Sequence, residues 1–146
     1  MAITGHLYAS YVAKANNGEI NFSSGTIKAV HLKNTYTPSQ TTHDYYDDIS
    51  AHVVTGTNIT AGGQAVASKT VTLVSLTQQF DAADTTFTNI TTTSPHIRYT
   101  AVYLDTGTAS TSPLIGYIDW GTDLPVVGGD FTVRWASTGI FTGTVA

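Results

Sequence analysis

The sequence contains no cysteine and little charge among its 146 residues. The missing thiols exclude a disulfide scaffold, a CxxC redox site and a thiolate zinc site. Charged residues make up 11% of the chain, less than half of the usual share of about 25%. The chain has six basic and ten acidic residues. The basic residues form no cluster of the kind that binds phosphate groups. We therefore expect no nucleic-acid partner.

Long apolar segments are missing as well. No stretch approaches the roughly 20 apolar residues that span a bilayer. The N-terminus lacks the basic region and the apolar region of a secretory signal. From these two absences we expect a protein that has no membrane partner and that is made in a cytosol, without export by the general secretion route.

Hydroxyl side chains supply the polarity that charged residues do not. The sequence has 27 threonines and 11 serines, but one glutamate and four lysines. Threonine is β-branched and favours strands, whereas glutamate and lysine favour helices. The composition therefore indicates an all-β protein, and the chain length suits one domain.

Alternating apolar residues between turn residues support this class. In residues 97–104 both alternating sets are partly apolar, which predicts a central strand covered on both faces. Residues 65–76 form a long β run in which Val66, Val71 and Val74 are the expected core positions. Further strands are predicted at 7–13, 19–22, 26–32, 114–120, 131–135 and 140–145.

The N-terminal segment is predicted to be separate from the rest of the domain. Asn16-Asn17-Gly18 is a strong hairpin-turn signal after the predicted strand 7–13. We interpret residues 1–25 as an N-terminal strand or arm that takes part in assembly. Residues 26–146 are expected to form the β-sandwich domain, which we call the body. Deletion of residues 1–20 is expected to weaken assembly more than it weakens the fold of the protomer.

One segment has helical spacing. Tyr45, Ile49 and His52, within residues 41–54, lie four and three positions apart, and Thr42 or Asp44 is the expected cap. The predicted fold is thus a single-domain, antiparallel β-sandwich or barrel with at most one short helix.

The same segment holds the densest group of acidic residues. Asp44 and Asp48 would share one side of a helix and, with Asp47 and His43, could bind a hard cation such as Ca²⁺ or Mg²⁺. Early carboxylates in a helix also complement the helix dipole without any ligand. The EF-hand spacing is absent, so we assign no metal ligand and leave cation binding open.

Other patterns give no reaction centre. Asp81 and Asp84 could form an acid–base pair, but aspartate is also a common turn residue. The five histidines lack HxH or HExxH spacing. Trp120 and Trp135 could stack on a sugar, although their apolar neighbours favour core or subunit contacts. We predict no enzyme, no catalytic or cofactor-binding residue and no cofactor.

Four segments carry a resemblance to a known family. In order they are 36–49 (YTPSQTTHDYYDDI), 55–63 (TGTNITAGG), 80–87 (FDAADTTF) and 103–117 (YLDTGTASTSPLIGY). Together they resemble small structural proteins of tailed bacteriophages, some of which resemble capsid decoration, or cement, proteins. The resemblance covers residues 26–140 and supplies no catalytic residue.

The resemblance implies a function in the virion. The chain would bind the outer surface of the capsid as a homo-oligomer, such as a trimer, and stabilise the shell. Its partners would be the major capsid protein and its own copies. Two alternatives remain open: a tail or fibre component that binds a host-surface glycan, and, less favoured, a small polysaccharide-degrading domain. The sequence does not indicate which surface would contact the capsid.

Overall fold

Strands dominate the computed structural model of the chain, which describes residues 2–144. The elements in chain order are β1 (Thr4–Leu7), α1 (Ser10–Asn16), β2 (Ile27–Lys33), α2 (Asp47–Ser50), β3 (Gly56–Thr57), β4 (Gln64–Ala65), β5 (Thr70–Val74), β6 (Thr77–Asp81), β7 (Thr85–Thr92), β8 (Ile97–Leu104), the 3₁₀ turn η1 (Ala109–Thr111), β9 (Leu114–Leu124), β10 (Gly129–Val133) and β11 (Phe141–Thr144). The predicted all-β class is confirmed. Residue 1 of the predicted arm and residues 145–146 of the predicted body lie outside the described residues.

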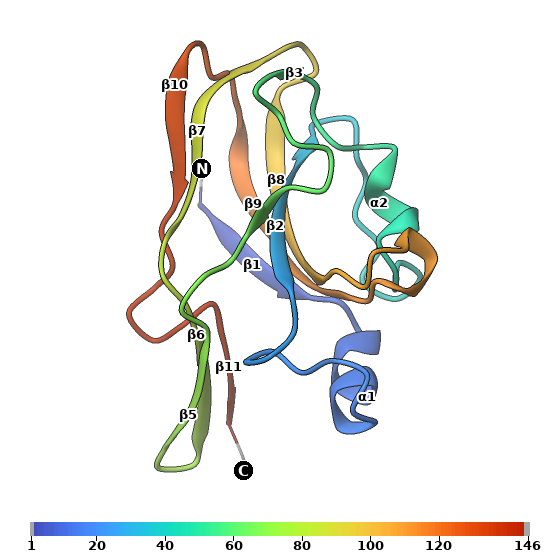
Figure 1. Cartoon of the computed structure of the whole chain (residues 1–146), viewed down its shortest axis with the longest axis vertical. Coiled ribbons are helices and arrows are strands. Elements are labelled where there is room, and N and C mark those ends of the chain that lie inside the picture. Colours follow the sequence, from blue (N-terminus) through green and yellow to red (C-terminus); the bar gives the residue numbers. More distant parts are fainter. Residues whose placement is uncertain (1, 145–146) are drawn as a thin grey trace.

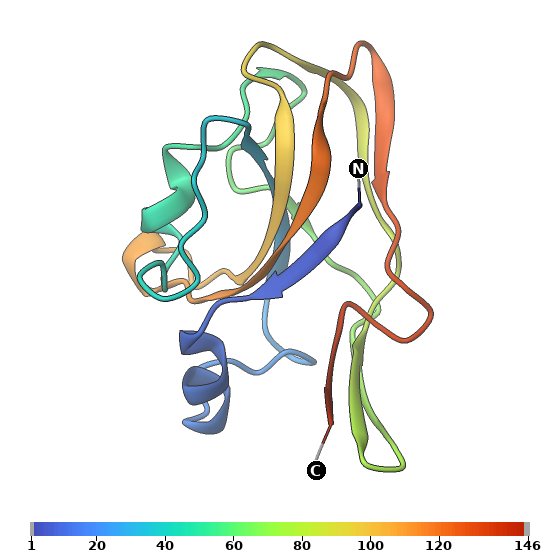
Figure 2. The same cartoon turned by 180° about the vertical axis from the view of Figure 1, so that it is seen from behind.

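The strands form one large sheet and two small ones. The large sheet has the order β1-β9-β8-β2-β4, and the small sheets have the orders β10-β7-β3 and β11-β6-β5. All pairings between these strands are antiparallel. The two small sheets lie on one side of the large sheet, with the β5–β6 hairpin extending past the body (Figures 1 and 2). The arrangement is that of a β-sandwich.

Two hydrophobic cores lie on opposite faces of the large sheet. The inner core, between the sheets, comprises Tyr11, Ile20, Phe22, Ile27, Ala29, Val54, Val66, Phe87, Ile90, Ile97, Val102, Leu104, Ile115 and Val133. The outer core comprises Tyr8, Val30, Leu32, Tyr36, Ile49, Val53, Ala101, Tyr103, Leu114 and Tyr117. Strand β8 sends Val102 into the inner core and Ala101 into the outer core, as its two apolar sets predict.

The outer core depends on the predicted helical segment. Helix α2 is a single turn, and its Ile49 is fully buried. The hydroxyl groups of Tyr8 and Tyr36 lie 3.1 Å apart within this core. A buried hydroxyl must find a hydrogen-bond partner, and each tyrosine supplies one for the other. The short helix at 41–54 was therefore predicted in the correct place.

A second helix stands where a strand was predicted. The predicted strand 7–13 is divided between β1 and α1, and residues 19–22 form no strand. Ala13, Lys14 and Ala15 favour a helix. Gly18 has φ of 77° and donates its N–H to Ala15 O, so it ends this helix. The Asn-Asn-Gly signal thus ends a helix, and the limit of one short helix is exceeded.

The predicted N-terminal arm is part of the body. Strand β1 pairs with β9 over four residues. Tyr8 belongs to the outer core, and Tyr11, Ile20 and Phe22 belong to the inner core. The segment 1–25 therefore supplies side chains to both cores, while its function in assembly stays a prediction.

The predicted long strand 65–76 is interrupted. The chain leaves β4 and turns at Ser68, which has φ of 53°, before β5 begins. Val66 is buried as predicted, but Val71 and Val74 are 42% and 55% exposed. Strand β5 lies at the edge of its sheet, beyond the layers that would cover it. The two core assignments at Val71 and Val74 were wrong for this reason.

Candidate functional site

The acidic residues around α2 have partners within the protein. Asp48 Oδ2 accepts hydrogen bonds from the backbone N–H groups of Asp44 (2.9 Å) and Tyr45 (3.2 Å). Partial burial acts to raise the pKa of Asp48, but these donors and nearby His43 hold it below its usual value. Asp44 lies 3.4 Å from Lys14 Nζ, and Asp47 is exposed. The N-cap of α2 is Tyr46, which makes no side-chain capping bond, so neither Thr42 nor Asp44 is the cap; Asp48 instead binds the backbone just before the helix.

No metal-binding group is assembled around them. Within residues 2–144, no three histidine, aspartate or glutamate side chains are placed to hold one metal ion. The five histidines are dispersed: His6 lies in β1 and His31 in β2, whereas His43, His52 and His96 lie in loops and turns. The structure therefore does not bring the candidate cation ligands Asp44, Asp47, Asp48 and His43 into a shared site.

The carboxylates considered for acid–base chemistry also have local partners. Asp81 Oδ1 accepts the N–H of Ala82 at 2.8 Å, and Asp84 Oδ1 accepts the N–H of Trp135 at 3.0 Å. A third carboxylate, that of Asp119, was not part of the predicted pair; it accepts a hydrogen bond from Arg98 Nε at 2.7 Å, and this bond lowers the pKa of its carboxyl group. A general acid of a glycosidase needs a raised pKa. Asp119 therefore lacks the property that this reaction requires.

Both tryptophans pack against the inner core. The indole N–H of Trp120 donates to Thr100 Oγ1 at 2.9 Å, and that of Trp135 donates to Ala83 O at 3.1 Å. These contacts agree with the expected packing function. They do not resemble the open platform on which a sugar ring stacks.

An exposed apolar surface lies on the β5–β6 hairpin. Leu73, Val74 and Leu76 are 68%, 55% and 61% exposed. Together with Val71 they form what we call the apolar hairpin. No charged residue occurs from 70 to 80, between Lys69 and Asp81. An edge strand without charge or proline is unprotected against pairing with another chain.

The apolar hairpin extends the face of the inner core. Val71 pairs directly with Phe80, and Phe80 pairs with Phe141. Residues directly opposite in an antiparallel pair point to one face of the sheet. Phe80 and Phe141 pack on Phe22 of the inner core, with ring centroids 5.6 Å apart in both pairs. The apolar face thus runs from the core to Val71 and Leu73, which no residue between 2 and 144 covers fully.

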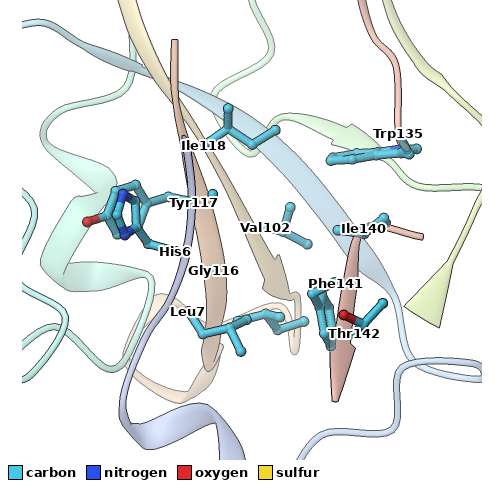
Figure 3. A pocket seen from close by; sticks show the side chains of 12 residues that line it. His6, Leu7, Val102, Gly116, Tyr117, Ile118, Trp135, Ile140, Phe141 and Thr142 are labelled. Atoms are coloured by element: carbon cyan, nitrogen blue, oxygen red, sulfur yellow. The ribbon is translucent and has the colours of Figure 1, made fainter. Parts of the chain in front are cut away.

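A cavity of about 250 Å³ lies near β1, β9 and β11. We call it the seam cavity. Figure 3 shows Trp135, Ile140 and Phe141 on one side, Val102 in the middle, and Ile118 and Leu7 facing them. The other lining residues are Gly5, His6, Ile115, Gly116, Tyr117 and Thr142. The lining is mainly apolar, so the cavity suits an apolar group.

Neither surface was predicted from the sequence. The uncharged run from 70 to 80 was a usable signal for the apolar hairpin, but it was interpreted as core. The seam cavity combines residues 5–7, 102, 115–118 and 135–142. Only the tertiary fold brings them together, so no pattern along the chain could have found it.

Comparisons with known proteins assign no family. The chain matches no protein-family model, no curated protein and no solved structure. The helices of the described residues lack the length and apolarity that a membrane span requires. The candidate site therefore consists of two apolar surfaces, the apolar hairpin and the seam cavity.

Proposed function

We propose that this chain is a structural protein of a tailed-bacteriophage virion that acts as a capsid decoration protein. It binds the outer surface of the capsid as an oligomer and stabilises the shell. Its partners are the major capsid protein and its own copies. The resemblance of residues 36–49, 55–63, 80–87 and 103–117 to phage structural proteins supports this proposal.

One structural observation carries the proposal: the apolar hairpin. Exposed apolar groups gathered on one projecting element are typical of protein–protein contacts. Leu73, Val74 and Leu76 stand on a hairpin that is hydrogen-bonded along β6 over five residue pairs. A preformed strand pair loses little conformational freedom when a partner covers it. Such an element suits a protein whose activity is attachment.

The threonine-rich surface is compatible with close packing of many copies. Hydroxyl pairs lie at 2.9 Å for Thr86 and Thr132 and at 3.0 Å for Thr77 and Thr144, across neighbouring strands. Threonine has fewer rotamers to lose on contact than lysine or glutamate. Weak contacts of this kind add through the high effective concentration within an oligomer.

Co-sedimentation with assembled capsid shells tests the proposal. We expect the chain to sediment with shells of its phage and to raise the temperature at which they release DNA. Cryo-electron microscopy of the decorated shells would locate the chain. A folded chain that binds no shell contradicts the proposal. A change in tryptophan fluorescence on a host-glycan panel, without shell binding, would favour the tail or fibre alternative.

A further inference from the structure

We propose that Lys14 and Asp44 become joined in the folded protein by an amide bond between their side chains, an isopeptide bond. Lys14 belongs to α1, and Asp44 belongs to the segment before α2. The bond links two parts of the chain that are 30 residues apart. It lies within one molecule, so it holds or fails independently of the capsid and of other copies.

The amine of Lys14 is the attacking group, and the fold holds it in a shielded place. Lys14 is 8% exposed, although lysine is among the residues that are least often buried. Its Nζ lies 2.8 Å from the backbone oxygen of Asp44 and 3.4 Å from Oδ2 of the same residue. The ring of Tyr45 covers Nζ, with its centroid at 3.3 Å. The amine is thus fixed beside one particular carboxyl group.

A second carboxylate is held beside the first. Asp48 Oδ2 accepts the backbone N–H of Asp44 at 2.9 Å and that of Tyr45 at 3.2 Å. The side chain of Asp44 is also within hydrogen-bonding reach of the Asp48 carboxylate. An amide bond requires an amine, a carbonyl carbon and a group that carries protons between them. Lys14, Asp44 and Asp48 supply these three groups.

The reaction is a condensation. The Lys14 ammonium gives one proton to the Asp44 carboxylate, which leaves a neutral amine and a neutral acid, the forms that a shielded site favours. Nζ then attacks Cγ of Asp44, and the Asp48 carboxylate takes one proton from the attacking nitrogen. Asp48 returns this proton to the departing hydroxyl group. A C–N bond forms, a C–O bond breaks and one water molecule leaves, so the step needs no oxidant, reductant or further reactant.

The fold supplies what lysine and aspartate lack in free solution. There, both groups are charged and well solvated, and they rarely meet in the reactive form. Groups that are held in a reactive arrangement behave as if present at about 10⁵–10⁸ M. Lys14 and Asp44 are held in this way by α1, by the Tyr45 ring and by the backbone contact of Nζ.

A second lysine–aspartate contact shows what an ordinary ion pair looks like in this protein. Lys28 Nζ lies 2.6 Å from Asp105, and the two side chains are 26% and 22% exposed. Lys28 and the N–H group of Gly107 act on the Asp105 carboxylate, and no second carboxylate of the described residues is among these groups. We therefore expect Lys28 and Asp105 to stay unlinked, which makes them an internal control.

Mass spectrometry of the unfolded, undigested chain tests the proposal. After several days at neutral pH, most wild-type chains should be lighter by one water molecule than the sequence requires. Proteolysis should then release a branched peptide in which Lys14 is joined to Asp44. A cyclic imide at an aspartate or asparagine also lowers the mass, but it joins no two peptides. The branched peptide therefore identifies the isopeptide bond.

Variants separate the contributions of the three groups. Lys14→Arg keeps the positive charge and Asp44→Ala removes the carbonyl carbon, so both should keep the full mass. Asp48→Asn retains an oxygen for the N–H groups of Asp44 and Tyr45 but carries no proton, so the bond should form about 10²–10⁴ times more slowly. Asp47→Asn is the matched control, because this exposed carboxylate is adjacent to Asp48. It should form the bond at the wild-type rate.

The unfolding temperature provides a second readout. The bond closes a loop in the unfolded chain and lowers its entropy, so the wild type should unfold at a higher temperature than Lys14→Arg. Full mass and no branched peptide, in wild-type chains that circular dichroism finds folded, would overturn the proposal. A loss of water that persists in Asp44→Ala would overturn it as well. A chain that carries the bond but binds no capsid shell contradicts only the proposed function.

Discussion

At the scale of single residues, His31 is the most unusual side chain. It is 2% exposed, and its ring centroid lies 3.9 Å from that of Phe87 and 4.8 Å from that of Phe131. Thr100 Oγ1 contacts His31 Nδ1 at 2.8 Å and accepts the indole N–H of Trp120. His31 Nε2 is buried and meets no hydrogen-bond partner among the described residues, so a charged ring would leave its N–H group unpaired. His31 is then held in the neutral form.

Burial lowers the pKa of His31 to about 3, against about 6.5 in an unfolded chain. Between these values the unfolded state binds the proton and the folded state does not. Stability should therefore be constant above pH 6.5 and fall as the pH decreases toward 3, with a slope approaching about 1.4 kcal/mol per pH unit. Urea unfolding between pH 7 and pH 4.5 measures this slope.

His31→Gln is the control for this prediction. The amide can still contact Thr100 but does not titrate in this range. The variant should be less stable at pH 7 by about 1–3 kcal/mol, the usual range for a disturbed buried polar group. Its stability should change less between pH 7 and pH 4.5. Equal slopes in the two proteins would show that other groups cause the acid sensitivity.

A second residue-scale prediction concerns the pairing of β1 with β9. A Cβ atom at Gly116 would lie 2.6 Å from the carbonyl oxygen of His6 and 3.2 Å from Leu7 Cδ2. Gly116→Ala should therefore push β1 outward and destabilise the fold by about 1–3 kcal/mol. Gly5→Ala, on β1 itself, meets nothing within 4 Å and should change stability by less than about 0.5 kcal/mol. Thermal unfolding of both variants measures the two changes in stability.

At the scale of elements, the N-terminal segment is the clearest departure from the sequence-based expectation. Lys14 in α1 is 8% exposed, and its Nζ donates to Asp44 O at 2.8 Å. The same ammonium group lies 3.3 Å from the ring centroid of Tyr45, within the range of a cation–π contact. Helix α1 is therefore attached to the segment before α2.

Deletion of residues 1–20 should consequently unfold the protomer, the opposite of the sequence-based expectation. The deletion removes β1 from the large sheet and takes Tyr8, Tyr11 and Ile20 from the two cores. Loss of one large core side chain alone costs about 3–5 kcal/mol. Circular dichroism and urea unfolding of the shortened chain measure this effect. A cooperative transition at the parent's midpoint would restore the interpretation of the segment as an independent arm.

The scale of elements also shows what can be predicted from sequence. Composition was sufficient to predict the all-β class. Period-two alternation was sufficient to predict β8 as a strand with two buried faces. The segment 41–54 does contain a short helix with Ile49 buried, but α2 spans Asp47–Ser50 alone, so Tyr45 and His52 of the predicted helical spacing lie outside it. In contrast, Val71 and Val74 lie in the β-forming run Thr70-Val71-Thr72-Leu73-Val74, which is typical of a core strand. Their exposure follows from the place of β5 at a sheet edge, which depends on long-range pairing.

At the scale of the whole molecule, surface charge is low and partly paired. Lys28 lies 2.6 Å from Asp105, and Arg98 lies 2.7 Å from Asp119. Such pairs contribute little to association with other molecules and are screened by salt. Interactions between copies therefore depend on apolar contact and hydrogen bonds.

The proposed self-association should accordingly be insensitive to salt. Between 50 mM and 500 mM sodium chloride, the sedimentation coefficient of the oligomer should not decrease. Cooling should weaken the contact, because the hydrophobic contribution declines at low temperature. Sedimentation velocity over both ranges measures these effects. Dissociation on addition of salt would indicate an electrostatic contact in place of the apolar one.

The apolar hairpin and the seam cavity belong to different strands, so a mutation can disable one and spare the other. A copy with a polar hairpin would keep its fold and its cavity but would lose the surface that it offers to a partner. In a closed oligomer, one such copy would weaken the whole ring that it enters. Its inhibitory effect would then exceed its share of the mixture, the behaviour that geneticists call dominant negative.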